Sequence, residues 1–332
     1  MTTTSLADIP GIRVGHVTDE RALTGCTAIV FPEGGVAGHV VCGVASGSRE
    51  LAALTPRHLV ERIHGICLSG GSAFGLAAAA GVMRRLEAAG IGHVTVRAKV
   101  PIVAGAVVYD LNLGDGGVRP DEAMGETAAD AALAGAPAAS GNIGAGAGVC
   151  AGKILGPACA TKTGLGNAGL STEEGLLVAA LAVVNPVGDV LDPTTGCAMA
   201  GARRGPASDE LVGTASLIRA GARCAPLDDH HTTLAVVGTN AALTRVEAAW
   251  VAEQAAVAIA RLIDPPFTRH DGDVVFCVSV GAAEGRVAVD VHRVGLLARD
   301  ALAAAIVNAC RSAAPAGGLP SCHGLRPPGA RA

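Results

Sequence analysis

The chain has 332 residues and is half apolar, so it can bury a sizeable core and is neither disordered nor fibrous. Its 25 basic and 29 acidic residues give a net charge of −4 without a basic run, which argues against nucleic acid as a partner. The longest clean apolar run, near residues 175–184, is much shorter than the roughly 20 residues of a membrane span, so we expect no membrane association.

The spacing of the cysteines and the composition of residues 1–10 bear on the cellular compartment of the protein. Ten cysteines are spread along the chain without a CxxC pair or a Cys/His cluster at zinc spacing. Residues 1–10 contain no cationic and apolar leader. We therefore expect reduced thiols, a cytoplasmic protein, and neither a metal nor another cofactor.

In the first half of the chain, short apolar runs alternate with Ala-rich stretches at helical spacing. Strands are predicted at residues 26–31, 39–44 and 65–68. Helices are predicted at 72–89 and at 120–133, the second opened by an acidic pair. The Gly-rich stretch 138–170 is predicted to form loops, and 176–184 a buried strand.

The second half begins with a polar, proline-containing stretch. We interpret residues 201–231 as a mobile or irregular connection with at most one short helix, near 209–220. A capping box at 244–247 then starts a helix that reaches about residue 263. The other elements predicted here are strands at 232–239, 274–280 and 286–291, a helix at 295–312, and a loose Pro- and Gly-rich tail at 313–332.

The strands occur in pairs and the helices in blocks. This order favours an α+β fold built as a layered sandwich over a doubly wound parallel sheet. No repeat of fixed period is present, and we expect one domain over residues 1–332.

Two motifs resemble binding sites but fail the pattern. The glycines at 144–148, followed by Gly152 and Lys153, suggest a phosphate loop, yet Ala147 and Ile154 stand where that loop needs Gly and Ser or Thr. The histidines 230, 231 and 270 with nearby aspartates lack the spacing of a metal site. We expect them to lie in a solvated loop.

The informative feature is the junction between His231 and Thr232, where the polar connection ends and an apolar strand begins. If this bond is cut, the strand starts with a free threonine. That residue combines a hydroxyl nucleophile with an α-amine of pKa ~7.7–8.0, which can act as its base. The same hydroxyl can attack the preceding carbonyl, so the chain would cut itself. A Thr-Thr pair is also ordinary at the start of a strand.

Several longer motifs carry a resemblance. They are I-P-G-I-R-V-G-H at 9–16, L-S-G-G-S-A-F-G-L at 68–76, V-P-I-V at 100–103, V-N-P-V-G-D at 184–189 and D-G-D-V-V-F at 271–276. On these the chain resembles, from about residue 9 to 312, the DmpA/NylC-type family of self-processing amide hydrolases. The resemblance implies a four-layer αββα sandwich and autocleavage into an α-chain of residues 1–231 and a β-chain of residues 232–332.

The resemblance also implies site residues, one by one. Thr232 matches the nucleophile, Lys153 a lysine that contacts and tunes it, and Asn185 an amide of the oxyanion hole. Tyr109 matches a pocket tyrosine, and Asp271 and Asp273 a carboxylate pair near the nucleophile's amine. Lys162 is the reserve if Lys153 is misplaced. The implied partners are small peptides or amides and further α/β pairs, in a homo-oligomer of tetramer size or larger.

One departure from the family leaves alternatives open. His231 stands before the nucleophile, where the family usually has Asn or Gly, so the efficiency of self-cleavage is in doubt. The favoured function is a self-processing aminopeptidase or amidase with an N-terminal threonine. The alternatives are an acyl transferase like ornithine acetyltransferase, which also cuts itself before a threonine, and an uncleaved, inactive relative with a binding or scaffold role.

Overall fold

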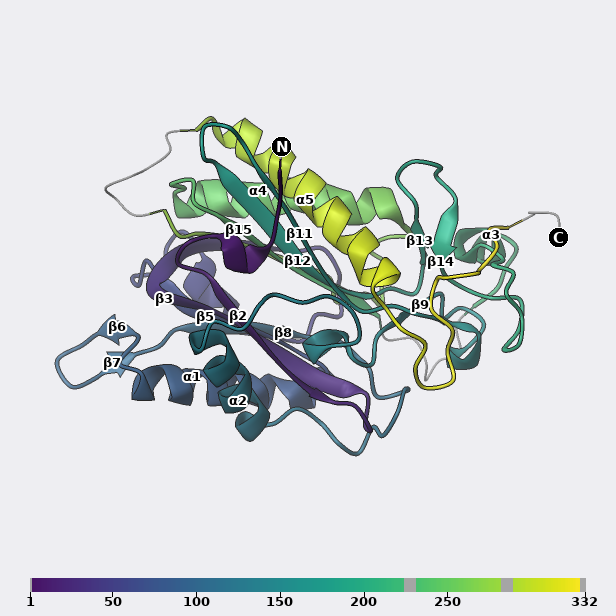
Figure 1. The fold of residues 1–332 in the computed structure, drawn as a ribbon, viewed down its shortest axis with the longest axis horizontal. Helices are drawn as coiled ribbons and strands as arrows, with labels where there is room; N and C mark the ends of the chain where they lie inside the picture. The colour runs from purple at the N-terminus through teal and green to yellow at the C-terminus, as the bar shows by residue number, and fades with distance from the viewer. Residues whose placement is uncertain (1, 224–230, 282–288, 329–332) are drawn as a thin grey trace.

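The computed structural model of the protein describes residues 2–223, 231–281 and 289–328. Two sheets lie face to face, with α4 and α5 on one outer face and α1 and α2 on the other (Figure 1). The helices are α1 (Ala78–Ala88), α2 (Glu122–Leu133), α3 (Thr214–Arg219), α4 (Arg245–Leu262) and α5 (Val291–Arg311). None of the described helices is both long enough and apolar enough to cross a membrane.

The two sheets share one strand, β3 (Thr24–Val41). Its register shifts between Val30 and Gly35, so its first part pairs with β2 and β5 and its last part with β17. One sheet has the order β1-β11-β12-β15-β17-β3, and the other continues from β3 through β5 and β8 to β4. The remaining strands are β1 (Thr2–Thr4), β2 (Arg13–Asp19), β4 (Ser48–Arg49), β5 (Ile63–Ser69), β6 (His93–Val94), β7 (Lys99–Val100), β8 (Val103–Val107), β9 (Cys150–Ala151), β10 (Thr161–Lys162), β11 (Leu165–Ser171), β12 (Leu177–Asn185), β13 (Asp189–Leu191), β14 (Ala198–Ala200), β15 (Thr232–Thr239), β16 (Ile263–Asp264) and β17 (Val274–Ser279).

Three apolar cores separate the four layers. One lies between the helix pair α4 and α5 and the sheet of β12 and β15, one between the two sheets, and one between the second sheet and the pair α1 and α2. The outer two cores are rich in alanine, which lets each helix lie close to its sheet. The predicted αββα sandwich is therefore confirmed.

Glycines inside strands account for part of the high glycine content. A Cβ on Gly166 of β11 would lie 2.0 Å from the carbonyl oxygen of Ala305 in α5, and one on Gly38 of β3 would lie 2.2 Å from the backbone nitrogen of Ala249 in α4. Only glycine permits such close helix–sheet contact. The prediction of loops through residue 170 was wrong for this reason, because the glycines of β11 are packing positions within a strand.

Most other elements fall where the pattern placed them, with shifted ends. The capping box of Thr244 and Glu247 begins α4 as predicted. The helix predicted from residue 295 begins at Val291, where the Asp290 side chain accepts a hydrogen bond from the His292 backbone. The strand predicted at 286–291 is therefore wrong over residues 289–291, and residues 286–288 lie outside the described residues.

The described part of the connection, residues 201–223, is irregular and contains the one short helix, α3. It is anchored by Arg203, which is 1% exposed and donates hydrogen bonds to five backbone carbonyls, among them Ala158 and Ala160. Residues 224–230 lie outside the described residues.

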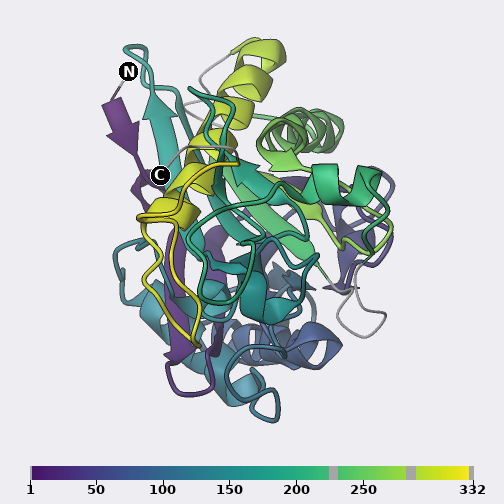
Figure 2. The same cartoon turned by 90° about the vertical axis from the view of Figure 1, so that its right-hand side faces the viewer.

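The described tail, residues 313–328, is packed rather than loose. Leu319 is buried beside Leu113 and Cys150, and the Pro320 carbonyl accepts the backbone N–H of Lys162. Arg326 forms an ion pair with Asp209. In Figure 2 the tail, in yellow, leaves α5 and folds back along the molecule. Few apolar side chains were needed to anchor it, which is why composition alone suggested a loose end.

Candidate active site

Thr232 is the first residue of β15, a central strand of the sheet. On one side β15 pairs antiparallel with β12, which places Thr232 opposite Asn185. On the other side it runs parallel to β17. The Thr232 side chain is 5% exposed, and its hydroxyl donates to the carbonyl oxygen of His231 at 2.5 Å. The hydroxyl therefore lies against the peptide group that the sequence predicts is cut.

Asn185 and Lys153 form a hydrogen-bonded pair beside this threonine. Lys153 Nζ donates to Asn185 Oδ1 at 2.7 Å, to the Asn185 carbonyl at 2.9 Å and to the Cys150 carbonyl at 3.0 Å. Directly opposed side chains on antiparallel strands have Cβ atoms about 5 Å apart, so Asn185 brings the lysine's charge close to Thr232. Both residues are buried.

The two aspartates lie just before β17, on the other side of β15. Asp273 Oδ1 accepts the backbone N–H of Thr233 at 2.5 Å, and Asp271 forms an isolated parallel bridge with His231. Burial and the neighbouring Asp271 carboxylate raise the pKa of Asp273 well above its ordinary value, against smaller opposing effects of the Thr233 N–H and the Lys153 cation. A carboxyl held in this way is a proton donor or acceptor close to the start of β15.

Tyr109 completes the predicted set. Its carbonyl accepts a hydrogen bond from Asn185 Nδ2 at 2.9 Å, and the residue lines a cavity of about 250 Å³ that reaches Thr232. All six predicted residues, Thr232, Lys153, Asn185, Tyr109, Asp271 and Asp273, therefore lie within one region of the fold. The cavity is also lined by Ala45, Ser46, Gly47, Ser72, Ala73, Val107, Val108, His231 and His270.

One expectation about this region needs correction. His231 is 1% exposed and forms an isolated bridge with Asp271 just before β15, so its side chain is buried and not solvated. His230 lies outside the described residues. Among the described residues no group of three His, Cys, Asp or Glu side chains is close enough to hold a metal ion.

Lys162, the reserve candidate, makes different contacts from those of Lys153. It is fully buried and donates to the carbonyls of Gly146 and Thr163, not to Asn185. Burial lowers its pKa to about 8, against the opposing influence of Cys150 and Asp110. The geometry thus favours Lys153 over Lys162 as the lysine beside the nucleophile.

The lowered pKa of Lys162 predicts a pH-dependent stability. Between about pH 8 and 10.4 the unfolded lysine keeps its proton while the folded one loses it. The free energy of unfolding should therefore rise with pH across this window, by up to about 3 kcal/mol from this group. Urea unfolding of Thr232→Ala, used to keep one intact chain, is compared with Thr232→Ala/Lys162→Met at pH 7.5 and 10. Parallel pH profiles for the two proteins would contradict the assignment.

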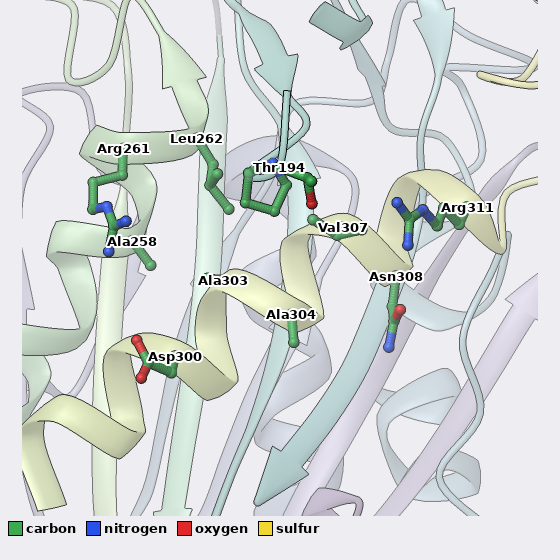
Figure 3. Close-up of a pocket in the computed structure, with 11 residues that line it drawn as sticks. Thr194, Ala258, Arg261, Leu262, Asp300, Ala303, Ala304, Val307, Asn308 and Arg311 are labelled. Atoms are coloured by element: carbon green, nitrogen blue, oxygen red, sulfur yellow. The ribbon is translucent and has the colours of Figure 1, made fainter. Parts of the chain in front are cut away.

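A larger cavity of about 400 Å³ lies elsewhere, on the outer helical layer (Figure 3). It lies between the ends of α4 and α5 and contains none of the six predicted residues. Ala303, Ala304 and Val307 form its apolar part, while Arg311 at its edge forms an ion pair with Asp192. Size alone therefore does not identify the active site, because Thr232 and Tyr109 line the smaller cavity.

Comparison with known proteins fits this geometry. A family model described as peptidase family S58 matches residues 4–321. The chain belongs to this family. It is 38% identical to an uncharacterized aminopeptidase of Mycobacterium leprae (strain TN), over 97% of this chain and 94% of the relative. It is 30% identical to the 6-aminohexanoate-oligomer endohydrolase of Kocuria sp. (strain KY2), over 92% of this chain and 85% of the relative.

Two solved structures share the fold. A Burkholderia sp. β-aminopeptidase superimposes with a TM-score of 0.69 at 20% identity, covering 96% of this chain and 91% of that chain. The L-aminopeptidase D-Ala-esterase/amidase of Ochrobactrum anthropi superimposes with a TM-score of 0.66 at 18% identity, covering 93% and 86%. The resemblance seen in the sequence is thus confirmed, and this S58 peptidase is a hydrolase of peptide or amide bonds.

Sequence reasoning did not find the other walls of the cavity. Ser46, Ser72 and His270 reach it from three separate segments. Strand pairing of β3 with β5 and β17, and of β5 with β8, brings these segments together. No local spacing in the sequence signals such a meeting.

Proposed function

We propose that this S58 peptidase cuts its own chain between His231 and Thr232 and then uses Thr232 as an N-terminal nucleophile to hydrolyse small peptides or amides. The observation that carries the proposal is the Thr232 hydroxyl, which lies 2.5 Å from the carbonyl oxygen of the residue before it. A hydroxyl in that position is adjacent to the carbonyl that it would attack.

The neighbouring charges support the second role. After cleavage the α-amine of Thr232 lies between the Lys153–Asn185 pair and the buried Asp273. A nearby ammonium disfavours a second positive charge, so Lys153 would lower the amine's pKa and keep it available as a base near neutral pH. In the cleaved enzyme, Asn185 Nδ2, which in the uncut chain donates to the Tyr109 carbonyl, would turn to the substrate's oxyanion as a second donor.

The cavity and the relatives point to the substrate class. A space of about 250 Å³ suits a single small residue or a short acyl group better than a long peptide. The endohydrolase and aminopeptidase names of the relatives agree with the hydrolysis of amide bonds. We propose that the cleaved protein works in the cytoplasm as a homo-oligomer, of tetramer size or larger, of α/β pairs.

Intact-mass measurement of freshly purified protein tests this proposal. The expected result is two chains of 231 and 101 residues, the shorter beginning with Thr232. Hydrolysis of a small aminoacyl p-nitroanilide should then appear in step with the 101-residue chain. A single persistent chain of 332 residues would favour the inactive binding or scaffold role, and acetyl transfer from acetylornithine without net hydrolysis would favour the acyl transferase.

A further inference from the structure

Two donors meet at the carbonyl oxygen of His231. The Thr232 hydroxyl lies 2.5 Å from it, and the backbone N–H of Gly272 donates to it at 2.9 Å. We propose that the Gly272 N–H is the oxyanion donor for cutting the His231–Thr232 bond, and that it later binds the carbonyl oxygen of the substrate in the same way. This inference rests on the proposed self-cleavage.

The loop that carries this N–H is held on both sides. Before it, the Asp271 carbonyl accepts the backbone N–H of Ala45 at 3.0 Å. After it, the Asp273 carbonyl accepts the backbone N–H of Cys42 at 2.9 Å, while the Asp273 carboxylate accepts that of Thr233. A donor fixed in advance toward a developing negative charge needs no reorganisation during the reaction, which is the property of an effective oxyanion hole.

Residue 272 must also be a glycine, because there is no space for a side chain there. A Cβ on Gly272 would lie 2.8 Å from the Ala45 carbonyl oxygen and 2.9 Å from Thr232 Oγ1. Both distances are shorter than real contacts of a Cβ. Because Gly272 has no side chain, its backbone can approach the nucleophile and the scissile carbonyl directly. A side chain at this position would prevent that approach.

Asn185 cannot replace this donor in the uncut chain without losing contacts. Its Oδ1 accepts from Lys153 Nζ and from the Cys150 backbone, and its Nδ2 donates to the Tyr109 carbonyl. The His231 carbonyl accepts hydrogen bonds from the Gly272 N–H and the Thr232 hydroxyl. Asn185 instead fixes the lysine beside them.

Self-cleavage transfers the acyl group of His231 from the nitrogen to the hydroxyl oxygen of Thr232. Thr232 Oγ1 forms a bond to the His231 carbonyl carbon, and the π electrons of that carbonyl move to its oxygen, where the Gly272 N–H stabilises them. The electrons then re-form the C=O bond as the C–N bond breaks, and the hydroxyl's proton is transferred to the departing nitrogen. The result is an ester and a new α-amine. Water hydrolyses the ester to a His231 carboxylate and a free Thr232 hydroxyl.

The test removes the hydrogen bond from the Gly272 N–H to the His231 carbonyl. Cell-free synthesis with glycolic acid in place of Gly272 exchanges the N–H for an ester oxygen and leaves the shape of the chain unchanged. Appearance of the 101-residue chain is followed by intact mass. We expect self-cleavage about 10²- to 10³-fold slower than in the parent made in the same way, because this is the usual cost of losing one oxyanion donor.

The matched control is lactic acid in place of Ala45. It removes the N–H that donates to the Asp271 carbonyl, a second hydrogen bond that an ester at residue 272 weakens directly. We expect this ester to slow self-cleavage at least tenfold less than the ester at residue 272 does. Equal slowing by the two esters, or a parent rate for the ester at 272, would overturn the inference. Cleavage of Thr232→Ala would instead overturn the proposed function, so the two failures are distinguishable.

Discussion

Thr232→Ala should remain a single chain of 332 residues and should hydrolyse no amide. The substitution removes the hydroxyl that lies 2.5 Å from the His231 carbonyl oxygen, and with it both the attack on the chain and the later nucleophile. Loss of a catalytic nucleophile typically lowers kcat by about 10⁶-fold. Intact mass and p-nitroanilide hydrolysis give the two readouts, and Thr232→Ser, which retains a hydroxyl, should keep part of each.

The adjacent Thr233 provides a control for the loss of a buried threonine hydroxyl. Thr233 is fully buried on the opposite face of β15, and its hydroxyl has no hydrogen-bond partner among the described residues. Thr233→Val keeps the shape of the side chain and should self-cleave at nearly the parent rate. If Thr232→Ala purified as two chains, or if Thr233→Val were blocked as well, a local packing defect rather than the nucleophile would explain the result.

The sequence predicted the layers of the fold because its apolar spacing is regular in most elements. Helix α4, with its Thr244 and Glu247 capping box, follows directly from local patterning. Strand β11 does not, because its glycines serve contact with α5, a partner that lies more than 100 residues away. The 18 residues of β3 likewise look like two strands, since its bend around residues 31–35 lets one strand serve both sheets.

The residues of the candidate site likewise include some that the sequence predicted and one, Gly272, that it did not. Thr232 stands out locally, as a polar residue at the exact start of an apolar run, and the motif resemblance supplied Lys153, Asn185, Tyr109 and the aspartates. Local reasoning had no access to Gly272, because a backbone N–H leaves no chemical mark in the sequence. Its role depends on the pairing of β15 with β17, which sets the His231 carbonyl beside it.

Lys153→Met should lower turnover per mole of 101-residue chain by about 10²- to 10⁴-fold. Without the ammonium, Asn185 loses its 2.7 Å hydrogen bond and the α-amine of Thr232 loses the charge that lowers its pKa. The amine's pKa should then rise, so the acid limb of kcat/KM against pH should move to higher pH. Self-cleavage is scored first by mass, and turnover is normalised to the cleaved fraction.

Lys162→Met separates this electrostatic role from the general effect of deleting a buried lysine. Both lysines are buried and donate to backbone carbonyls, but only Lys153 donates to Asn185. Lys162→Met should therefore keep the parent's pH profile even where its stability changes. If Lys153→Met lowered the melting temperature and the rate but left the acid limb in place, Lys153 would be a packing residue. If Lys162→Met moved the acid limb instead, the charge that tunes the nucleophile would belong to Lys162, acting through the hydrogen-bonded backbone of β9 and β10.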